Sequence, residues 1–559
     1  MSLHFYRIVC LVGWGLLLTG GAYAQSTVSG QVISSEDNIA LPGVNVIVKG
    51  TSSGTVTDID GNYRISVPAA GSVLTFSFIG YQSQDVEIGN QSTINIALEP
   101  DTRQLSEVIV TAIGIEREER ALGYSVETLK GEQVQQVSEP DPLRALQGKV
   151  PGVNISGSTG APGSATRVTI RGQSSFLGNN EPLYVVDGTP YFSEQATTYN
   201  QLTGGASYSS PFAALDPNSI ESISVLKGAA AASLYGSRAG NGVIVITTKA
   251  GSPGLSKKGL EVTVSSSYSL EQIGNLPEYQ NTYGNGAEFQ YRFGSNGSWG
   301  APFAWLDSVP VWPQYKTAYP NLFSDSIPYV ARPDNVESLF RDGQVWDNSV
   351  TIQGGSENTS FSLTASHLDQ QGYIPESAFT RTSISVGARA TLDNGLRAGG
   401  NLSYSVSEQN GPIFGESGAS DPAAASSFAR TLWLGRTWNM DLPYEDPTGA
   451  SLFFTNQDNP IWSWKNNGVK SNLDRVTANA NIGYDFTEWL SVDYRIGINQ
   501  FNDRRQQVWN QGSVAFGGSG SVIDDDIYRQ EIESNFIVTV ERDLSESLYL
   551  KGLIGHNIN

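Results

Sequence analysis

Three short patterns in the sequence hold residue types that often carry chemistry. The first, Asp58-Ile-Asp60-Gly61, places two carboxylates before a glycine, as calcium-binding loops do. When Gly61 is laid on the sixth position of an EF-hand loop, the first and twelfth positions fall on Val56 and Val67, which have no oxygen ligands. Aspartate and glycine also favour turns for local reasons, so the sequence predicts a hairpin turn here.

The other two patterns lie in a run that is predicted to be strand, helix and strand. Ser224 and Lys227 match S-x-x-K, but they fall inside a predicted strand and lack the S-D-N and K-T-G motifs that accompany such a site. Phosphate-binding loops place their glycines before a helix, so that its first N–H groups face the anion. Here the glycines follow the helix predicted over 229–235, which indicates a helix C-cap and a turn; they are Gly236, Gly240 and Gly242.

Histidine and cysteine are too scarce for most metal sites. Beyond the first 24 residues the chain has only His367 and His556, and its one cysteine is Cys10. We therefore predict no disulfide, no metal, no cofactor and no catalytic residue, and we expect a protein that is not an enzyme. The formal net charge of -21 argues against a nucleic-acid partner, because binding phosphate requires a basic face.

Residues 1–24 have the pattern of a secretory signal peptide. A short polar start is followed by the apolar run 8–18 and by Ala22-Tyr23-Ala24, so we expect cleavage between Ala24 and Gln25. The apolar run is shorter than the ~20 residues that a membrane-spanning helix needs, and no run of that length follows. An exported chain of this kind is either soluble or a membrane β-barrel.

Two smaller domains are expected before the last region. Residues 25–100 hold short β-rich runs separated by turn residues, which is typical of a small β-sandwich. Residues 116–251 mix strands with helices, including a short helix over 141–148 with Asp141 as its N-cap and Pro142 at its first position. Strands are predicted there at 153–155, 167–171, 182–188, 219–228 and 242–248.

From residue 252 to 559 long strands alternate apolar residues with polar ones. The connections between them run long, short, medium, short, long, short, long, short, which is the order expected of an outer-membrane barrel and has no reason to occur in a soluble sandwich. The predicted strands lie at 260–271, 347–355, 358–369, 379–392, 395–408, 473–486, 489–502, 528–542 and 546–557.

Tryptophan is concentrated in this last region. Trp489 lies beside a predicted short turn, where an interfacial aromatic girdle would be. Others lie in long loops and either stack on a substrate or a partner, or pack the loops together; Trp299, Trp305 and Trp312 are the candidates for substrate contact.

Several ordered motifs resemble a known family. The run from Leu41 to Tyr63 resembles the carboxypeptidase-regulatory-like domain. LQGKVPGVNISGSTGAPGSATRVTIRGQSS, EPLYVVDGTP and SIESISVLKGAAAASLYGSRAGNGVIVITTKAG resemble the plug domain of TonB-dependent outer-membrane transporters. This order of domains is similar to that of the SusC/RagA family, and the resemblance runs through Gly251.

The resemblance implies a fold, a mechanism and partners. Residues 101–115 would hold the TonB box, centred on Glu107, Val108, Ile109, Val110, Thr111 and Ala112. TonB would pair with this strand by β-augmentation, and a SusD-like surface lipoprotein would close over the barrel. The family imports oligosaccharides or peptides through the outer membrane. A receptor for an iron chelate or cobalamin, and a secreted β-rich adhesin, remain alternatives. Within the plug motifs Arg171, Asp187 and Arg238 are expected to stabilise the plug.

The predicted barrel is too small to hold the predicted plug. About nine strands leave a lumen that side chains already fill, whereas plugged transporters use ~22 strands. The sequence also stops after a strand, at His556-Asn-Ile-Asn559, without a terminal aromatic residue. We therefore expect an N-terminal portion of a longer barrel.

Overall fold

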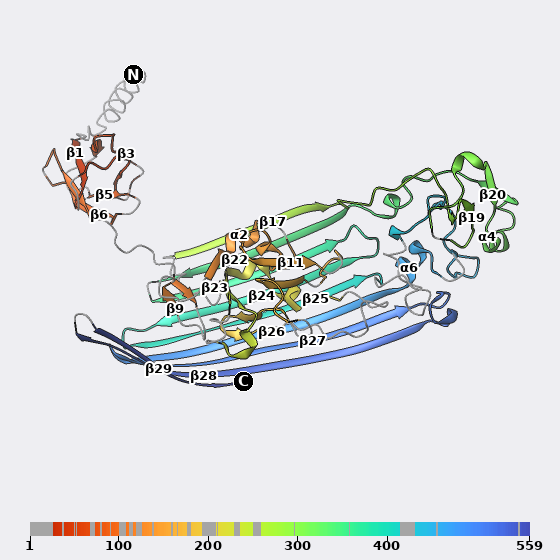
Figure 1. The fold of residues 1–559 in the computed structure, drawn as a ribbon. Coiled ribbons are helices and arrows are strands. Elements are labelled where there is room, and N and C mark those ends of the chain that lie inside the picture. Colours follow the sequence, from red (N-terminus) through yellow and green to blue (C-terminus); the bar gives the residue numbers. More distant parts are fainter. Residues whose placement is uncertain are drawn as a thin grey trace, which may run out of the picture. The chain divides into compact units, whose positions relative to one another are not determined.

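Figure 1 shows the fold of the chain in a computed structural model. It describes residues 26–35, 39–49, 51, 53–67, 73–78, 81–89, 91–99, 108–110, 116–118, 126–136, 139–157, 160–164, 166–175, 180–192, 208–209, 211–228, 235–249, 259–295, 297–356, 358–413, 431–453, 457–545 and 548–559. The expected cleavage site at Ala24 and Gln25 and most of the helix expected over 229–235 lie outside these residues. The chain divides into two compact units at Val108.

The first unit contains a β-sandwich, as predicted. One sheet has the order β4 (Asn62–Val67), β1 (Ser26–Ser34), β7 (Ile96–Leu98). The other has the order β3 (Gly54–Val56), β2 (Asn45–Val48), β5 (Val73–Ser77), β6 (Gln84–Glu87). Alternate residues point inward, and Val46 and Phe76 are fully buried between the sheets. Tyr63 packs edge-on against Phe76 and donates its hydroxyl to the carbonyl of Ile94 at 2.9 Å; burial raises the pKa of Tyr63 to about 12.

The Asp58 pattern forms a turn between β3 and β4. Asp58 Oδ1 accepts hydrogen bonds from the backbone N–H groups of Asp60 at 3.0 Å and Asn62 at 2.8 Å. Gly61 has a φ of 73°, a conformation that glycine adopts without strain. The carboxylate of Asp58 therefore shapes the backbone of a hairpin turn.

The plug contains a five-stranded mixed sheet with the order β10, β15, β16, β13, β14. A short helix, α2 (Gly131–Gln135), and a separate hairpin of β11 (Val153–Gly157) and β12 (Thr166–Ile170) accompany it. The predicted helix over 141–148 is wrong in extent, because only a 3-10 turn forms at Arg144–Leu146. Asp141 still accepts from the N–H of Leu143 at 2.9 Å, so its capping role is kept. The five strands of the sheet are β10 (Val126–Lys130), β15 (Ile220–Leu226), β16 (Val243–Thr248), β13 (Leu183–Val186) and β14 (Thr189–Pro190).

The last region forms one antiparallel sheet of nine strands among the described residues, each paired with the next along the chain. Every strand predicted there is present, and most extend further than predicted. They are β17 (Gly259–Glu271), β22 (Gly343–Gly355), β23 (Thr359–Gln371), β24 (Ala378–Thr391), β25 (Leu396–Gly411), β26 (Gly468–Thr487), β27 (Leu490–Trp509), β28 (Ser521–Ser545) and β29 (Leu548–Ile558). The sheet curves around the plug elements as part of a barrel wall, and the long connections gather at one end (Figure 1).

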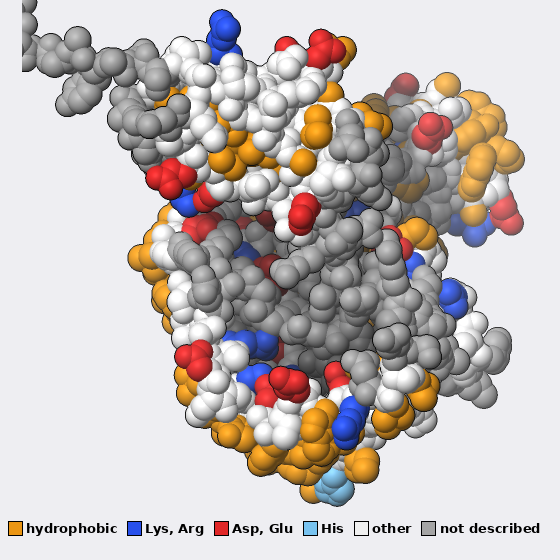
Figure 2. All heavy atoms as spheres, turned by 90° about the vertical axis from the view of Figure 1, so that its left-hand side faces the viewer, with side chains coloured by type: hydrophobic (Ala, Val, Ile, Leu, Met, Phe, Trp, Pro, Cys, Tyr) orange, Lys and Arg blue, Asp and Glu red, His pale blue; other side chains and the backbone are white. Residues whose placement is uncertain are grey.

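The two faces of this wall carry opposite chemistry. Outward positions hold exposed apolar side chains such as Val264, Ile384 and Ile482. Inward positions hold buried polar side chains such as Ser383 and Ser385. Figure 2 shows hydrophobic side chains along the outer rim of the curved wall, with charged side chains on its inner side. This confirms the predicted alternation of apolar outward residues with polar inward residues, a pattern typical of an outer-membrane barrel.

No helix in the described part of the chain has both the length and the apolar character that crossing a membrane requires.

Candidate functional site at the plug and barrel interface

The plug segment 211–219 lies directly on the inner wall. It contains two 3-10 turns, Pro211–Ala214 and Pro217–Ser219, each of which begins with a proline. Ala213 packs against Val345, Leu368 and Phe379, and Ala214 packs against Leu473 and Phe501. Small side chains let this backbone approach the strands closely, which brings its carbonyl groups within reach of the wall.

Two buried arginines of the wall hold those carbonyl groups. Nη1 of Arg381 on β24 donates to the carbonyls of Pro140, Ala213 and Leu215 at 2.8, 3.0 and 3.2 Å. Arg475 on β26 donates to the carbonyls of Pro211 at 3.1 Å and Phe192 at 3.2 Å.

The guanidinium of Arg475 is buried, and it has further contacts besides these two carbonyls. It also donates to Oδ1 of Asn499 and lies 3.4 Å from the centre of the Tyr191 ring. A buried cation is stable only when such partners replace its water. Removing the plug would take most of these partners away.

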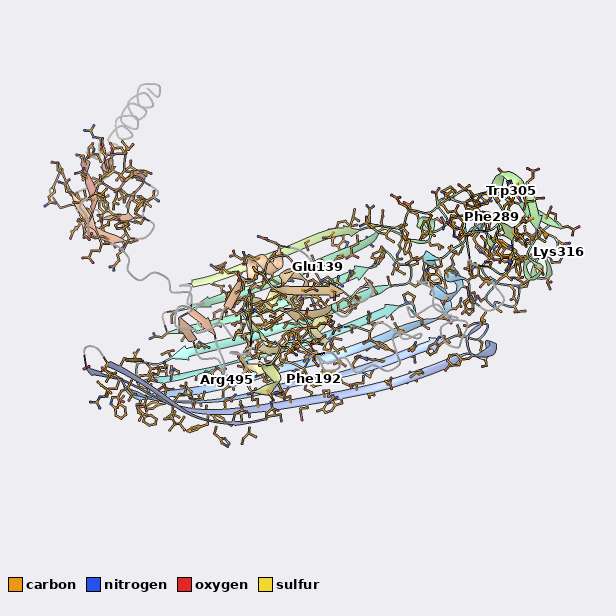
Figure 3. All side chains as sticks on the ribbon, in the orientation of Figure 1. Glu139, Phe192, Phe289, Trp305, Lys316 and Arg495 are labelled. Carbon is orange, nitrogen blue, oxygen red and sulfur yellow. The ribbon has the colours of Figure 1, made fainter. Side chains whose placement is uncertain are left out.

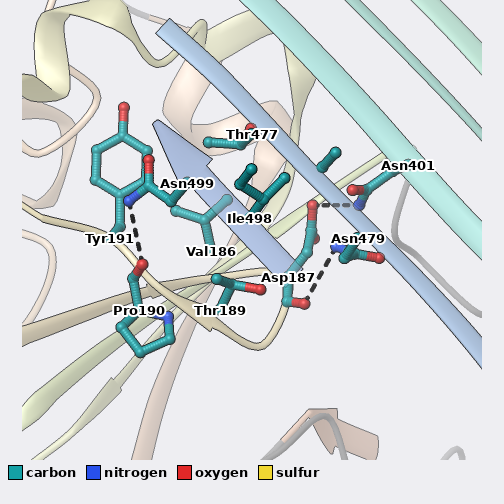
Figure 4. Close-up of a pocket in the computed structure, with 11 residues that line it drawn as sticks. Val186, Asp187, Thr189, Pro190, Tyr191, Asn401, Thr477, Asn479, Ile498 and Asn499 are labelled. Atoms are coloured by element: carbon teal, nitrogen blue, oxygen red, sulfur yellow. Dashed lines mark hydrogen bonds between the residues drawn. The ribbon is translucent and has the colours of Figure 1, made fainter. Parts of the chain in front are cut away.

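The turn between β13 and β14 makes a second attachment (Figure 4). Asp187 has a φ of 48°, and its carboxylate accepts from the N–H of Thr248 at 2.8 Å, from Thr248 Oγ1 at 2.7 Å and from Asn401 Nδ2 at 2.6 Å. Nδ2 of Asn479 donates to the Asp187 carbonyl at 3.4 Å, and Nδ2 of Asn499 donates to the Pro190 carbonyl at 3.2 Å. Burial raises the pKa of Asp187, and the bonds from Thr248 and Asn401 oppose that shift.

A small cavity lies beside this turn, between it and strands β25, β26 and β27. Its volume is about 230 Å³, including space open to solvent. Its lining includes Asn401, Asn479 and Asn499, the three asparagines that hydrogen-bond to the plug.

The three polar residues of the plug motifs have different roles. Asp187 and Arg238 both reach the wall, since Nη1 of Arg238 donates to Glu531 Oε1 on β28 at 3.1 Å. Arg171 stays within the plug, where its N–H donates to the Gly152 carbonyl at 2.7 Å and its φ is 60°.

Most of the wall residues in this site were not identified from sequence. Arg381, Arg475, Asn401, Asn479 and Asn499 were missed as individual residues, although each lies at an inward position of its strand. The sequence offers one signal for these residues: each is a charged or amide side chain at a position that the alternation places on the inward face of its strand.

The loop tryptophans differ in how far they are buried. Trp312 is buried, its ring centre is 3.9 Å from that of Trp438, and its indole N–H donates to Tyr291 at 2.9 Å. It packs the loops and presents no surface to a ligand. Trp299 and Trp305 are 62% and 67% exposed. In Figure 3 Trp305 and Phe289 both lie among the long loops, away from the plug.

The expected TonB box is only partly described. Val108–Val110 form β8, and Glu107, Thr111 and Ala112 lie outside the described residues. β8 pairs with β9 (Glu116–Glu118) in a two-stranded sheet. Among the residues that the structure describes, β8 therefore pairs along one edge only, with β9.

The described residues contain no cluster of three or more histidine, cysteine, aspartate or glutamate side chains able to hold a metal ion.

Two domain families match the chain. Residues 28–110 match the CarboxypepD_reg-like domain, and residues 118–243 match the TonB-dependent Receptor Plug Domain. These matches account for the sandwich and the plug, and neither family extends into the nine-stranded sheet.

Whole-chain relatives extend the similarity into that sheet. TonB-dependent receptor P3 of Formosa agariphila is 30% identical over 87% of this chain and 43% of its own length. TonB-dependent receptor SusC of Bacteroides thetaiotaomicron is 28% identical over 88% of this chain and 45% of its own. The chain therefore spans about half the length of the curated relatives it matches.

A solved structure shares the fold. The RagAB peptide importer in its open-open state matches with a TM-score of 0.63 at 21% identity, over 80% of this chain and 48% of that one.

Proposed function

This chain belongs to the SusC/RagA family of TonB-dependent receptors, and from that premise we propose that the complete protein imports oligosaccharides or peptides across the outer membrane. The observation that carries the proposal is the way the plug is held. Its attachments to the wall include hydrogen bonds made by Arg381, Arg475 and three asparagines, largely to backbone carbonyls. Such bonds can be exchanged for water, so the plug can be drawn aside without unfolding the wall.

The proposed route begins at the outer loops. Substrate contacts the loops and the outer face of the plug, and Trp299 and Trp305 offer exposed aromatic surface there. A SusD-like lipoprotein acts as a lid over the same end. The RagAB structure that shares this fold is that of a peptide importer, which supports import as the task of the complete protein.

Energy enters at the opposite end of the route, through residues 107–112. TonB adds a strand to the other edge of β8, or replaces β9, and draws on the chain that leads into the plug. Main-chain hydrogen bonds suit this task because the pulling force then passes along the backbone.

A pair of substitutions at one position tests this mechanism in the complete protein. Ile109→Pro removes a backbone N–H donor and distorts the strand, so we expect import to be lost while substrate still binds at the cell surface. Ile109→Ala keeps the main-chain bonds and should retain most of the import. Deletion of residues 107–112 should match the proline variant. Import by the proline variant or the deletion at the rate of the unmodified protein would contradict the TonB-box assignment.

A further inference from the structure

The plug hairpin of β11 and β12 takes part in two separate hydrophobic cores. Near its base, Ile155, Val168 and Ile170 are buried in the core of the plug. At its tip, which the structure describes over residues 160–164, Ala161 is 5% exposed and belongs to a core that is formed by the outer connections of the wall. The tip of this plug hairpin therefore packs with the loops.

The core shared by the outer connections is called the loop core below. Its buried side chains come from the connections that precede β22, β24 and β26. Among the residues that the structure describes, Ala161 is its one member from the plug. Helix α6 (Pro460–Asn466) contributes Trp464, which is 4% exposed. The buried members include Leu339, Ile374, Trp438 and Trp464.

Tyr373 connects the tip to other members of the loop core. A Cβ placed on Gly160 would lie 2.4 Å from the hydroxyl oxygen of Tyr373, so the backbone of the tip passes directly against this side chain. The ring centre of Tyr373 is 6.2 Å from that of Phe340, which is 6.3 Å from that of Trp464. Both distances are in the range of interacting aromatic rings. A series of packed side chains therefore joins the tip to α6.

Two residues of the wall fix the position of the tip. Nε2 of Gln409 on β25 donates to the carbonyl of Pro162 at 2.8 Å. Gly163 has a φ of 66°, and a Cβ placed on it would lie 2.4 Å from a ring carbon of Phe379 on β24. Because Phe379 is fully buried, its ring has little room to give way. The tip therefore occupies its place only while residue 163 lacks a side chain.

The tip is also tied to the body of the plug. β11 and β12 pair as far as Gly157 and Thr166, so their ladder ends next to the tip. Nε of Arg144 donates to Oγ1 of Thr166 at 3.3 Å, which holds this end of the ladder on the turn Arg144–Leu146. A displacement of the tip therefore disturbs the ladder, and a displacement of the ladder moves the tip.

We propose that this hairpin couples the seating of the plug to the packing of the outer loops. While the tip is seated it completes the loop core, and drawing the plug off the wall withdraws the tip and loosens the loops around α6. The coupling is reciprocal, so loosening the loop core weakens the hold on the plug to the same extent. This inference requires only that the plug be seated in the barrel, and it depends on neither the substrate nor TonB.

Hydrogen exchange of the complete protein in detergent micelles tests the coupling from the side of the plug. In Gly163→Ala the added methyl group meets the ring of Phe379 and displaces the tip. We therefore expect a peptide spanning residues 459–467, which contains α6, to exchange at least about fivefold faster. In the unmodified protein the N–H groups of Ser463 and Asn467 in this peptide donate to backbone carbonyls at 2.9 and 2.8 Å.

A matched control separates contact with the wall from backbone strain. Gly148 has a φ of 72° and open space where a Cβ would lie, so Gly148→Ala imposes a similar strain on the plug without a collision. It should leave the exchange of α6 unchanged. Gln409→Met removes the hydrogen bond to the Pro162 carbonyl at similar side-chain length, and it should speed the exchange of α6 by less than Gly163→Ala does. A peptide spanning residues 490–509 of β27 shows whether the wall is still folded in each variant.

The reverse direction is tested from the loops. Trp464→Ala truncates the loop core, so a peptide spanning residues 153–170 of the hairpin should exchange at least about fivefold faster. Trp433→Ala removes an indole from the same connection that is 64% exposed, and it should leave the hairpin unchanged.

The two directions must agree. The proposal is overturned if α6 exchanges at the unmodified rate in both Gly163→Ala and Gln409→Met, or if Gly148→Ala speeds it as much as Gly163→Ala does. If Gly163→Ala disturbs the β27 peptide, Gln409→Met alone decides this arm. The proposal is also overturned if Trp464→Ala leaves the hairpin unchanged, or if Trp433→Ala alters the hairpin equally.

Discussion

The N-terminal sandwich and the barrel wall are built from the same alternation of residues, and they use it in opposite directions. In the sandwich, Val46 and Phe76 point inward and are fully buried. In the wall, Ile384 points outward with 48% of its surface exposed, while its neighbours Ser383 and Ser385 are buried against the lumen. A period of two therefore establishes that a segment is a strand with two different faces. It does not establish which face is the interior; the surrounding solvent decides that.

The sheet of the plug shows a third arrangement, in which both faces of a strand are buried. All six residues of β16 are buried, so its sequence is an almost continuous apolar run ending in two threonines. Other elements cover both of its faces, and no alternation is needed. The sandwich, the wall and the plug sheet thus differ in what touches the faces of their strands, and their sequences differ accordingly.

The largest expected effect comes from truncating the sandwich core. Phe76→Ala removes a fully buried ring that packs on Tyr63, and we expect the free energy of unfolding of the sandwich to fall by about 3–5 kcal/mol. Hydrogen exchange of a peptide spanning residues 62–77 in the complete protein would measure the loss. The matched variant, Phe361→Ala, truncates an outward ring of the wall that is 43% exposed, and it should cost much less. Equal losses of stability in the two variants would show that the outward face of the wall is buried as an interior face is, which would contradict the comparison.

A smaller effect is expected when a charge is placed on the outward face of the wall. Ile384→Lys puts an ammonium group at mid-strand, and a charge on the lipid side of a barrel costs about 2–4 kcal/mol at the bilayer midplane. The folded fraction of the complete protein in lipid vesicles, titrated with urea, gives the value. Ile384→Met has a similar length without the charge and should be nearly neutral. If Ile384→Lys is as stable as the unmodified protein in this titration, lipid does not contact this face.

Much of the structure of the wall could be predicted from the sequence. The alternation and the connection lengths predicted all nine strands of the wall, with ends that differ by a few residues. The largest differences occur at the outer ends of β26, β27 and β28, which extend beyond the predicted segments. Polar residues such as Lys470 and Gln506 occur there, where the strands rise above the apolar zone and the pattern weakens.

The attachment of the plug was far less predictable. Arg381 and Arg475 bind backbone carbonyls, and every residue has a carbonyl group, so the partner segments carry no side-chain signal. Asp187 was singled out as plug-stabilising, but its partner Asn401 lies 214 positions away in the chain. The division of the loop tryptophans could not be predicted either, because Trp312 and Trp305 differ only in what packs around them.

The smallest expected effect comes from comparing two turns. In each turn a side-chain oxygen accepts hydrogen bonds from backbone N–H groups. In the sandwich Asp58 accepts from two backbone N–H groups, whereas Asn394, in a short turn of the wall, accepts from one, that of Leu396 at 3.1 Å. Asp58→Ala should therefore lower the stability of the sandwich by about 1 kcal/mol, in the range for losing side-chain bonds that cap backbone donors. Asn394→Ala should cost less than that, because one bond is lost and the neighbouring strands keep their pairing. Asp58→Asn preserves an acceptor oxygen and should recover most of the loss, which thermal unfolding of the two sandwich variants would measure. A loss with asparagine as large as with alanine would show that the negative charge of Asp58, and not its hydrogen bonds, stabilises the turn.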